Sequence, residues 1–136
     1  MKIDGACHCD YITYEAEADP KRVGICHCTD CQTLSGAAFR TGIRVASDGF
    51  RMLSGEPAIY VKTAESGAKS AQAFCPRCGS PIYASRAGDA PKFYNLRLGT
   101  VRQRDQLVPK VQFWSRSQLH WLLGLASIPK IEKQEL

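Results

Sequence analysis

The sequence lacks any apolar run near the length of a membrane-spanning helix, which needs about 20 consecutive apolar residues. Its first residues, Met1 to Gly5, have neither an apolar core nor a small-residue cleavage pattern, so we expect no signal peptide. Both absences favour a cytoplasmic protein with no membrane partner. The 136 residues are enough to bury one core, so we expect a single domain over residues 1–136, with 127–136 as a peripheral tail.

The chain also lacks a basic run of five or more residues, although its formal net charge of +5 suggests a nucleic-acid partner at first sight. Its lysines and arginines are scattered along the sequence. If the seven cysteines bound two divalent metal ions as thiolates, the thiolates would contribute −7 and the ions +4, and the net charge would fall to +2. We therefore do not expect nucleic acid as a partner.

Helical periodicity is scarce, and strand patterns recur about every ten residues with turn residues between them. Strands are predicted over 11–18, 23–26, 38–45, 58–62, 70–74, 81–84 and 93–98, and segment 50–53 precedes a turn at 54–57. The best helix candidate is 117–123, with Ser115 or Ser117 as N-cap and Gly124 as its end. This spacing predicts a mainly β fold of antiparallel strands with at most one or two short helices.

Cysteine, in contrast, is abundant, with seven residues, an odd number that disulfides could not pair completely. In a reducing compartment, clustered cysteines indicate metal binding or catalysis. The clearest motif is Cys75-Pro76-Arg77-Cys78-Gly79, because two thiolates spaced C-x-x-C on a tight turn can bind one metal ion. A thioredoxin-like redox pair is the rival interpretation, but it needs a βαβ context that the spacing does not predict.

A second pair, Cys7 and Cys9, points to one side of an extended chain, with His8 pointing away. Neither pair alone completes a tetrahedral site. Together, Cys7, Cys9, Cys75 and Cys78 would form the all-cysteine set typical of a structural zinc ion. Cys9 and Cys75 lie 66 residues apart, so such an ion would join distant parts of the chain.

The remaining three thiols, Cys26, Cys28 and Cys31, lie within six residues. Three protein ligands and an open position are typical of a catalytic zinc site. The alternative is a second structural site whose fourth ligand is His27, His8, Asp30 or water. Cys26 and Cys28 could also pair with the 75–78 motif, and an iron–sulfur cluster is a further option. We favour a division into four and three, because local triplets close the shortest loops.

Several of these motifs, in this order, resemble the glutathione-dependent formaldehyde-activating enzyme family, which includes centromere protein V. The matching segments are Gly5 to Cys9, Cys26 to Gln32, Ser35 to Phe39, Ser54 to Glu56 and Phe74 to Tyr83. The resemblance implies layered antiparallel sheets organised around cysteine-ligated zinc. It implies two Zn²⁺ per chain, a structural ion on Cys7, Cys9, Cys75 and Cys78 and an exchangeable, catalytic ion on Cys26, Cys28 and Cys31.

Two functional hypotheses follow. The first is a carbon–sulfur lyase-type enzyme that acts on a thiol–aldehyde adduct such as S-hydroxymethylglutathione, with the substrate thiolate bound at the three-cysteine zinc. Its partner would be glutathione or a similar small thiol, whose carboxylates could meet Arg40, Arg44 or Arg51. The second is a non-catalytic, zinc-stabilised binding module for protein or nucleic acid. The fourth ligand of the second ion distinguishes them, because an enzyme must exchange it.

Overall fold

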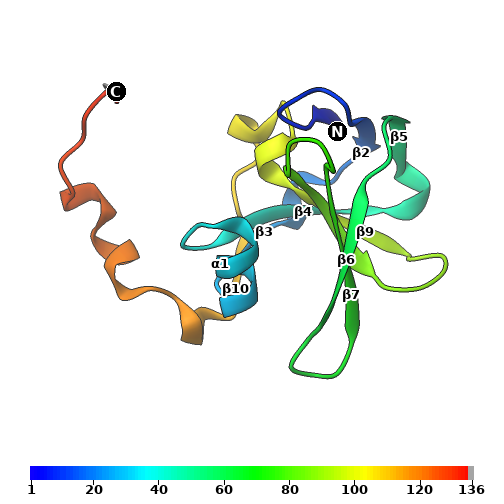
Figure 1. Cartoon of the computed structure of the whole chain (residues 1–136). Coiled ribbons are helices and arrows are strands. Elements are labelled where there is room, and N and C mark those ends of the chain that lie inside the picture. The colour runs from blue at the N-terminus through cyan, green and yellow to red at the C-terminus, as the bar shows by residue number, and fades with distance from the viewer. Residues whose placement is uncertain (135–136) are drawn as a thin grey trace.

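The structure is a computed structural model that describes residues 1–134, and its strands form two sheets (Figure 1). The smaller sheet has the order β1-β2-β5 and is antiparallel, with bounds Lys2–Ala6, Thr13–Glu17 and Phe50–Ser54. The larger sheet has seven strands in the order β10 (Val111–Phe113), β3 (Val23–Cys26), β4 (Arg40–Ala46), β9 (Phe93–Arg97), β8 (Pro81–Arg86), β7 (Lys69–Phe74) and β6 (Ala58–Thr63). The predicted mainly β fold with layered sheets is confirmed.

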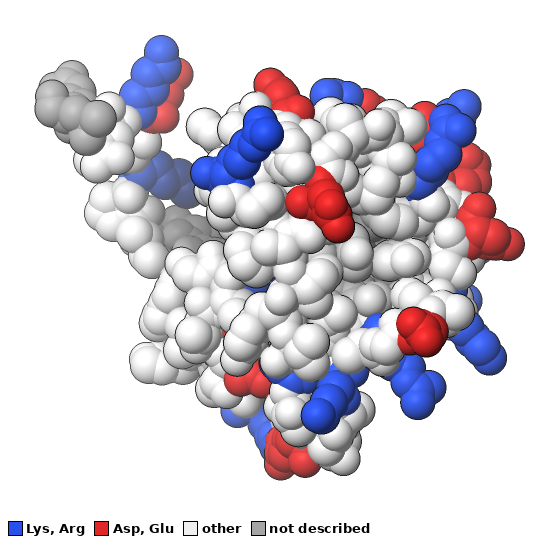
Figure 2. All heavy atoms as spheres, turned by 45° about the vertical axis from the view of Figure 1, so that its right-hand side comes forward, with Lys and Arg blue, Asp and Glu red and all other residues white. Residues whose placement is uncertain are grey.

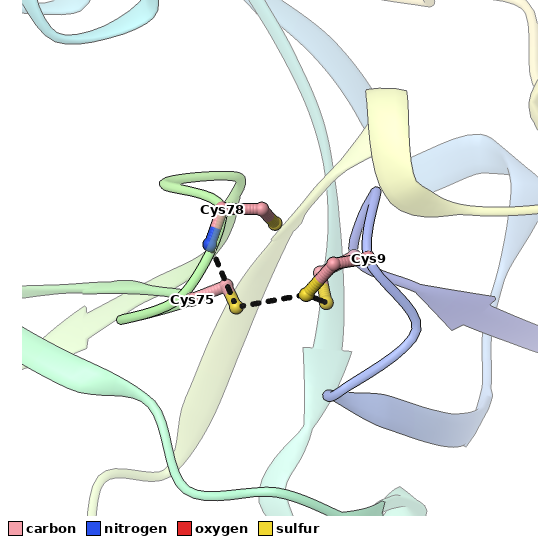
Figure 3. A group of neighbouring side chains, drawn as sticks. Cys9, Cys75 and Cys78 are labelled. Atoms are coloured by element: carbon pink, nitrogen blue, oxygen red, sulfur yellow. Dashed lines mark hydrogen bonds between the residues drawn. The ribbon is translucent and has the colours of Figure 1, made fainter.

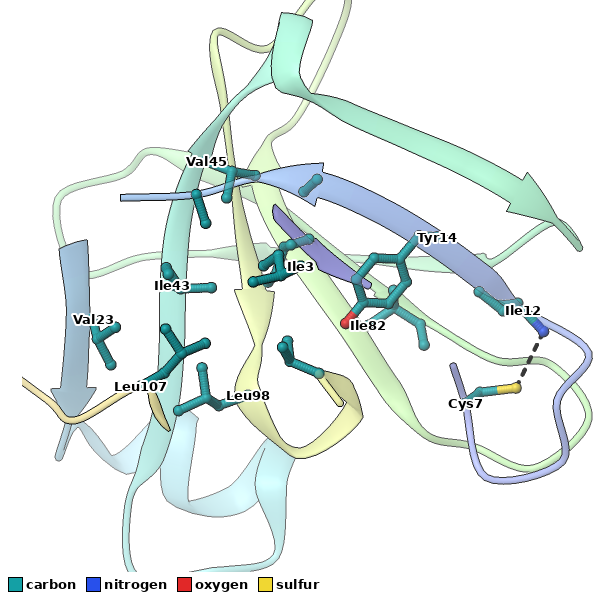
Figure 4. Close-up of a cluster of buried hydrophobic side chains, with 14 of the residues drawn as sticks. Ile3, Cys7, Ile12, Tyr14, Val23, Ile43, Val45, Ile82, Leu98 and Leu107 are labelled. Carbon is teal, nitrogen blue, oxygen red and sulfur yellow. Dashed lines mark hydrogen bonds between the residues drawn. The ribbon is translucent and has the colours of Figure 1, made fainter. Parts of the chain in front are cut away.

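Alternation along the strands gives the larger sheet two different faces. On β4, Ile43 and Val45 are buried while Arg44 between them is exposed. The buried side chains join those of the smaller sheet in one core (Figure 4), which includes Ile3 and Tyr14. Gly5 on β1 permits this close approach, because an added Cβ would lie 2.4 Å from the Thr100 carbonyl oxygen and from the Tyr14 ring.

One parallel pair departs from the expected antiparallel pattern. β10 pairs with β3 in parallel, with Phe113 opposite Cys26. The sequence pattern missed β10 and β1, both of which lie at a sheet edge. The consequence for function is that the chain after residue 110 returns to lie beside the cysteine triplet.

Helix α1, Thr29–Ser35, was also not predicted. Its N-cap is Cys28, whose sulfur accepts a hydrogen bond from the Cys31 N–H at 3.3 Å, and its C-cap is Gly36 in the left-handed conformation. Cysteine is not among the side chains that usually mark an N-cap. The glycine at the C-cap was the available signal.

The prediction of a helix over 117–123 was wrong. This region forms two 3₁₀ segments, Ser115–Ser117 and His120–Ser127, and the second runs past Gly124. Neither segment buries a residue, so neither receives the tertiary packing that stabilises short α-helices.

Beyond β10 the chain leaves the sheets, as Figure 1 shows in orange and red. Leu123 and Ile131 in this segment are 87% and 86% exposed. The tail expected over 127–136 extends to residues 135 and 136, which lie outside the described part of the chain. Among residues 1–134, no helix has the length and apolar character needed to cross a membrane.

Candidate metal centres

The first cysteine cluster joins two turns that are distant in sequence. Cys7 and Cys9 follow β1, and Cys75 and Cys78 lie in the connection between β7 and β8 (Figure 3). The second turn is closed by a 2.8 Å hydrogen bond from the Gly79 N–H to the Cys75 carbonyl, with Gly79 at a φ of +79°. The four sulfurs all lie within 4.8 Å of one another.

The spacing of these sulfurs suits a tetrahedral zinc ion. The Cys7–Cys9 and Cys9–Cys75 sulfur distances are 3.7 and 3.8 Å. Zinc–sulfur bonds of about 2.3 Å in a tetrahedron place neighbouring sulfurs about 3.8 Å apart. Backbone N–H groups of Arg77 and Cys78 also donate to the Cys75 sulfur at 3.4 and 3.5 Å. The donor set therefore fits one closed zinc site.

The second cluster consists of Cys26 at the end of β3, Cys28 at the N-cap of α1 and Cys31 in the first turn of α1. Their sulfurs also lie within 4.8 Å of one another, and all three residues are half-buried. The structure thus groups the seven cysteines as four and three. Cys26 and Cys28 do not join the 75–78 turn.

The three thiols differ in acidity. Burial raises the pKa of Cys26 and, with the hydrogen bond to Cys28, raises that of Cys31 to about 12. Burial also opposes ionisation of Cys28, but the Cys31 N–H, the two neighbouring thiols and the charge of Lys62 together lower its pKa. Cys28 is therefore the thiol best prepared to ionise first, and a bound cation would favour the thiolate form of all three.

None of the other proposed ligands joins the triplet sulfurs. His27 is buried, and its Nε2 lies 2.7 Å from Gln112 Oε1 on β10. Asp30 forms an ion pair with Lys62 at 3.0 Å. His8 lies on the turn of the first cluster. Within residues 1–134, no histidine nitrogen or carboxylate oxygen completes the triplet, so its protein ligands number three.

The chain is similar to known proteins in its sequence profile and in its fold. The profile of the family described as glutathione-dependent formaldehyde-activating enzyme matches residues 2–117, a range that includes all seven cysteines. The chain belongs to the glutathione-dependent formaldehyde-activating enzyme family. A crystal structure of a Rhodobacter sphaeroides protein has the same fold, with a TM-score of 0.60 and 18% identity, over 81% of this chain and 98% of that one. No curated protein matches the sequence significantly.

The family match points to glutathione-related formaldehyde activation. Two cavities adjoin the triplet. One is lined by Cys26 with Arg40 and Arg44, and another by Cys28 with Lys62. Arg51, the third arginine proposed for the substrate carboxylates, was a wrong choice. It lies on β5 in the smaller sheet and pairs with Glu15, because nearness in sequence does not imply nearness across two sheets.

Other residues at the site were missed. Arg97 on β9 lines the same cavity as Arg40, and Gln72 on β7 accepts hydrogen bonds from both. Gln32 in α1 donates to the His27 and Ser117 carbonyls at 2.8 and 3.1 Å and so fixes the helix against the returning chain. No local motif marks Arg97 or Gln72, because strand order alone brings them together, whereas Gln32 lies in the Cys26 to Gln32 segment that resembles the family.

Proposed function

We propose that this protein is a zinc-dependent carbon–sulfur lyase-type enzyme acting on a thiol–aldehyde adduct such as S-hydroxymethylglutathione. One zinc ion would be structural, on Cys7, Cys9, Cys75 and Cys78. The second would be exchangeable, on Cys26, Cys28 and Cys31, and a small thiol such as glutathione would be the partner. The observation that carries the proposal is that the cluster of Cys26, Cys28 and Cys31 offers three thiols with no fourth protein ligand among the described residues, and that two cavities adjoin it. Seven unpaired cysteines suit a cytoplasmic location.

The three thiolates would hold the ion and leave one position free. When bound, zinc supplies there a site at which a substrate thiol is deprotonated near neutral pH. The Cys31 N–H and Lys62 already favour the thiolate of Cys28, and partial burial limits the access of water to the sulfurs. Three negative ligands make the site better suited to holding a thiolate than to polarising a carbonyl.

The bond changes of the proposed reaction balance without a further reagent. The substrate sulfur attacks the aldehyde carbon and forms the carbon–sulfur bond. The carbonyl oxygen takes up a proton and becomes the hydroxyl group of the adduct, which replaces the proton that the thiol has lost. The reverse direction cleaves the same bond and releases thiol and aldehyde.

A non-catalytic binding module is the second candidate. The apolar side chains exposed beyond β10, with Leu123 and Ile131 nearly free of contacts, are the observation in its favour. The face in Figure 2 carries lysines, arginines and acidic residues interspersed around a broad uncharged area, so this face offers no basic surface for a nucleic acid. A module would retain a fixed ligand set at the triplet, whereas an enzyme would exchange one ligand.

Calorimetry with the zinc-loaded protein distinguishes the two candidates. Glutathione should bind and release a proton, because a free thiol has a pKa of about 8.5 and must ionise to reach the ion. Titrations in two buffers of different ionisation enthalpy measure that proton. S-methylglutathione cannot form a thiolate and should bind much more weakly. Equal affinity for both compounds without proton release would favour the binding module.

A further inference from the structure

The outer face of the larger sheet contains a hollow of about 280 Å³ beside Cys26. Its floor is formed by Gly24 on β3 and Gly42 on β4, which lie opposite each other in the strand register. A Cβ at Gly24 would lie 3.0 Å from the Phe113 ring, and one at Gly42 would lie 2.0 Å from Asn95 Oδ1. The two glycines therefore make room for the side chains of Asn95 and Phe113, which also line the hollow.

Cations surround this floor. Alternation along β4 and β9 places Arg40, Arg44 and Arg97 on the same face as Gly42, since Gly42 pairs with Arg97. Lys21 and Arg22 reach the rim from the 3₁₀ turn Pro20–Arg22. Within residues 1–134, no acidic residue lines the hollow, and none of its five cations forms an ion pair.

Two of these cations, Arg40 and Arg97, share one hydrogen-bond acceptor; Arg40 is buried and Arg97 is half-buried. Arg40 is only 7% exposed, and its Nε is buried without a hydrogen-bond partner. Its Nη1 donates at 3.1 Å to Gln72 Oε1, the same neutral oxygen to which Arg97 Nη2 donates at 2.8 Å. Burial, and next the neighbouring Arg40, lower the pKa of Arg97 to about 10.

Buried charges without counter-charges are costly, so a pair held by one amide oxygen requires compensation. The nearby sulfurs supply part of it, as their charge favours protonated Arg97. Three thiolates and one zinc ion carry only −1 in total, however, against five cations. The remaining positive charge faces the hollow, where an anion could form paired hydrogen bonds with the guanidinium groups.

We propose that this hollow binds the carboxylates of the substrate thiol and makes the enzyme selective for thiols that carry acidic groups. The inference rests on the proposed function, since it assumes that the substrate sulfur lies at the triplet. Arg40 and Arg97 receive one carboxylate, and Arg22 and Arg44 provide the charge at the rim. Gln72 is a positioning residue that holds the Arg40 and Arg97 guanidinium groups together without neutralising them.

Binding of glutathione and of its dimethyl ester to the zinc-loaded full chain tests the proposal. The ester retains the thiol but has no carboxylate, so it should bind at least tenfold more weakly. Arg22→Gln and Arg44→Gln should each weaken glutathione binding about three- to tenfold and leave binding of the ester unchanged. Arg51→Gln is the matched control, since Arg51 pairs with Glu15 on the other sheet, and should alter neither.

Gln72→Glu provides a readout besides affinity. A carboxylate between Arg40 and Arg97 should reduce glutathione affinity at least tenfold while the melting temperature stays equal or rises, because the buried pair gains a counter-charge. The proposal would be overturned if the ester and glutathione bound equally well, or if glutathione did not bind at all. It would also be overturned if Arg22→Gln or Arg44→Gln weakened binding of both compounds to the same extent. Selective binding without carbon–sulfur bond formation would contradict the proposed function alone, whereas equal turnover of both compounds would contradict this inference alone.

Discussion

Replacing Cys75 with serine should destabilise the protein far more than replacing Cys28 with serine. Cys75 is fully buried and joins a turn between β7 and β8 to a turn after β1. Cys28 belongs to a cluster that is local in sequence. The comparison is well matched, because serine is a good N-cap and should keep the start of α1 intact when Cys28 is replaced.

The expected magnitude follows from the length of chain that each metal cross-link closes. Cys9 and Cys75 are separated by 66 residues, and closing a loop of that length removes about 4 kcal/mol of conformational entropy from the unfolded chain. Cys26 and Cys31 are five residues apart, for which the same relation yields about 2 kcal/mol. A domain of this size has a total stability of about 5 to 15 kcal/mol. Losing the first cross-link therefore leaves little stability.

Thermal unfolding of the zinc-loaded variants measures this difference. Cys75→Ser should lower the melting temperature by roughly 10 to 20 °C, and Cys28→Ser by half of that or less. The Cys28 variant should keep its fold and lose activity. Equal destabilisation by the two substitutions would mean that both clusters are structural. The inference of a catalytic site at Cys26, Cys28 and Cys31 would then fail.

Three further predictions concern metal exchange, the core and pH. Mild chelation should remove the triplet ion first, leaving one zinc per chain by elemental analysis, whereas simultaneous loss of both ions would show equivalent sites. Gly5→Ala should lower the free energy of unfolding by about 3 kcal/mol, since its Cβ would overlap the Thr100 carbonyl oxygen. The control Gly99→Ala should change that free energy by less than about 0.5 kcal/mol, because a Cβ there has nothing within 4 Å. Similar urea midpoints for the two variants would refute this packing argument. Burial raises the pKa of Tyr14 from 10.0 to about 12, so its contribution of about 2 to 3 kcal/mol is fully present below pH 10 and is lost as the pH rises to 12. Urea unfolding at pH 9 and 11.5 should show this loss in the natural protein but not in Tyr14→Phe, and an equal loss in both would assign it to other groups.

The cysteine grouping could be anticipated from sequence because metal ligands cluster locally. Thiols at close spacing can bind one ion only on turns, and such turns leave signals such as Gly79 after Cys78. Most strands were also anticipated, since alternation reflects the burial of one sheet face. Helix α1 was missed because its N-cap is Cys28, and cysteine is not among the residues that usually mark an N-cap.

The arginine hollow could be anticipated only in part. The sequence analysis named Arg40 and Arg44 for the substrate carboxylates, but it could not place Arg97 beside them. Arg40 and Arg97 are far apart in sequence and meet only because β9 pairs with β4. The local sequence pattern does not contain that strand pairing, so the sequence did not distinguish Arg97 from the other scattered lysines and arginines. The same limit explains the wrong choice of Arg51, whose strand pairs with β2 instead.

The most direct test of the account is the coordination of the two metal ions in a crystal of the protein purified without chelator, with anomalous scattering recorded at the zinc edge. Two zinc ions per chain are predicted, one bound by Cys7, Cys9, Cys75 and Cys78, and one bound by Cys26, Cys28 and Cys31 with water or an added thiol as the fourth ligand. A single ion, a metal other than zinc, or a protein side chain in the fourth position of the triplet would contradict the account.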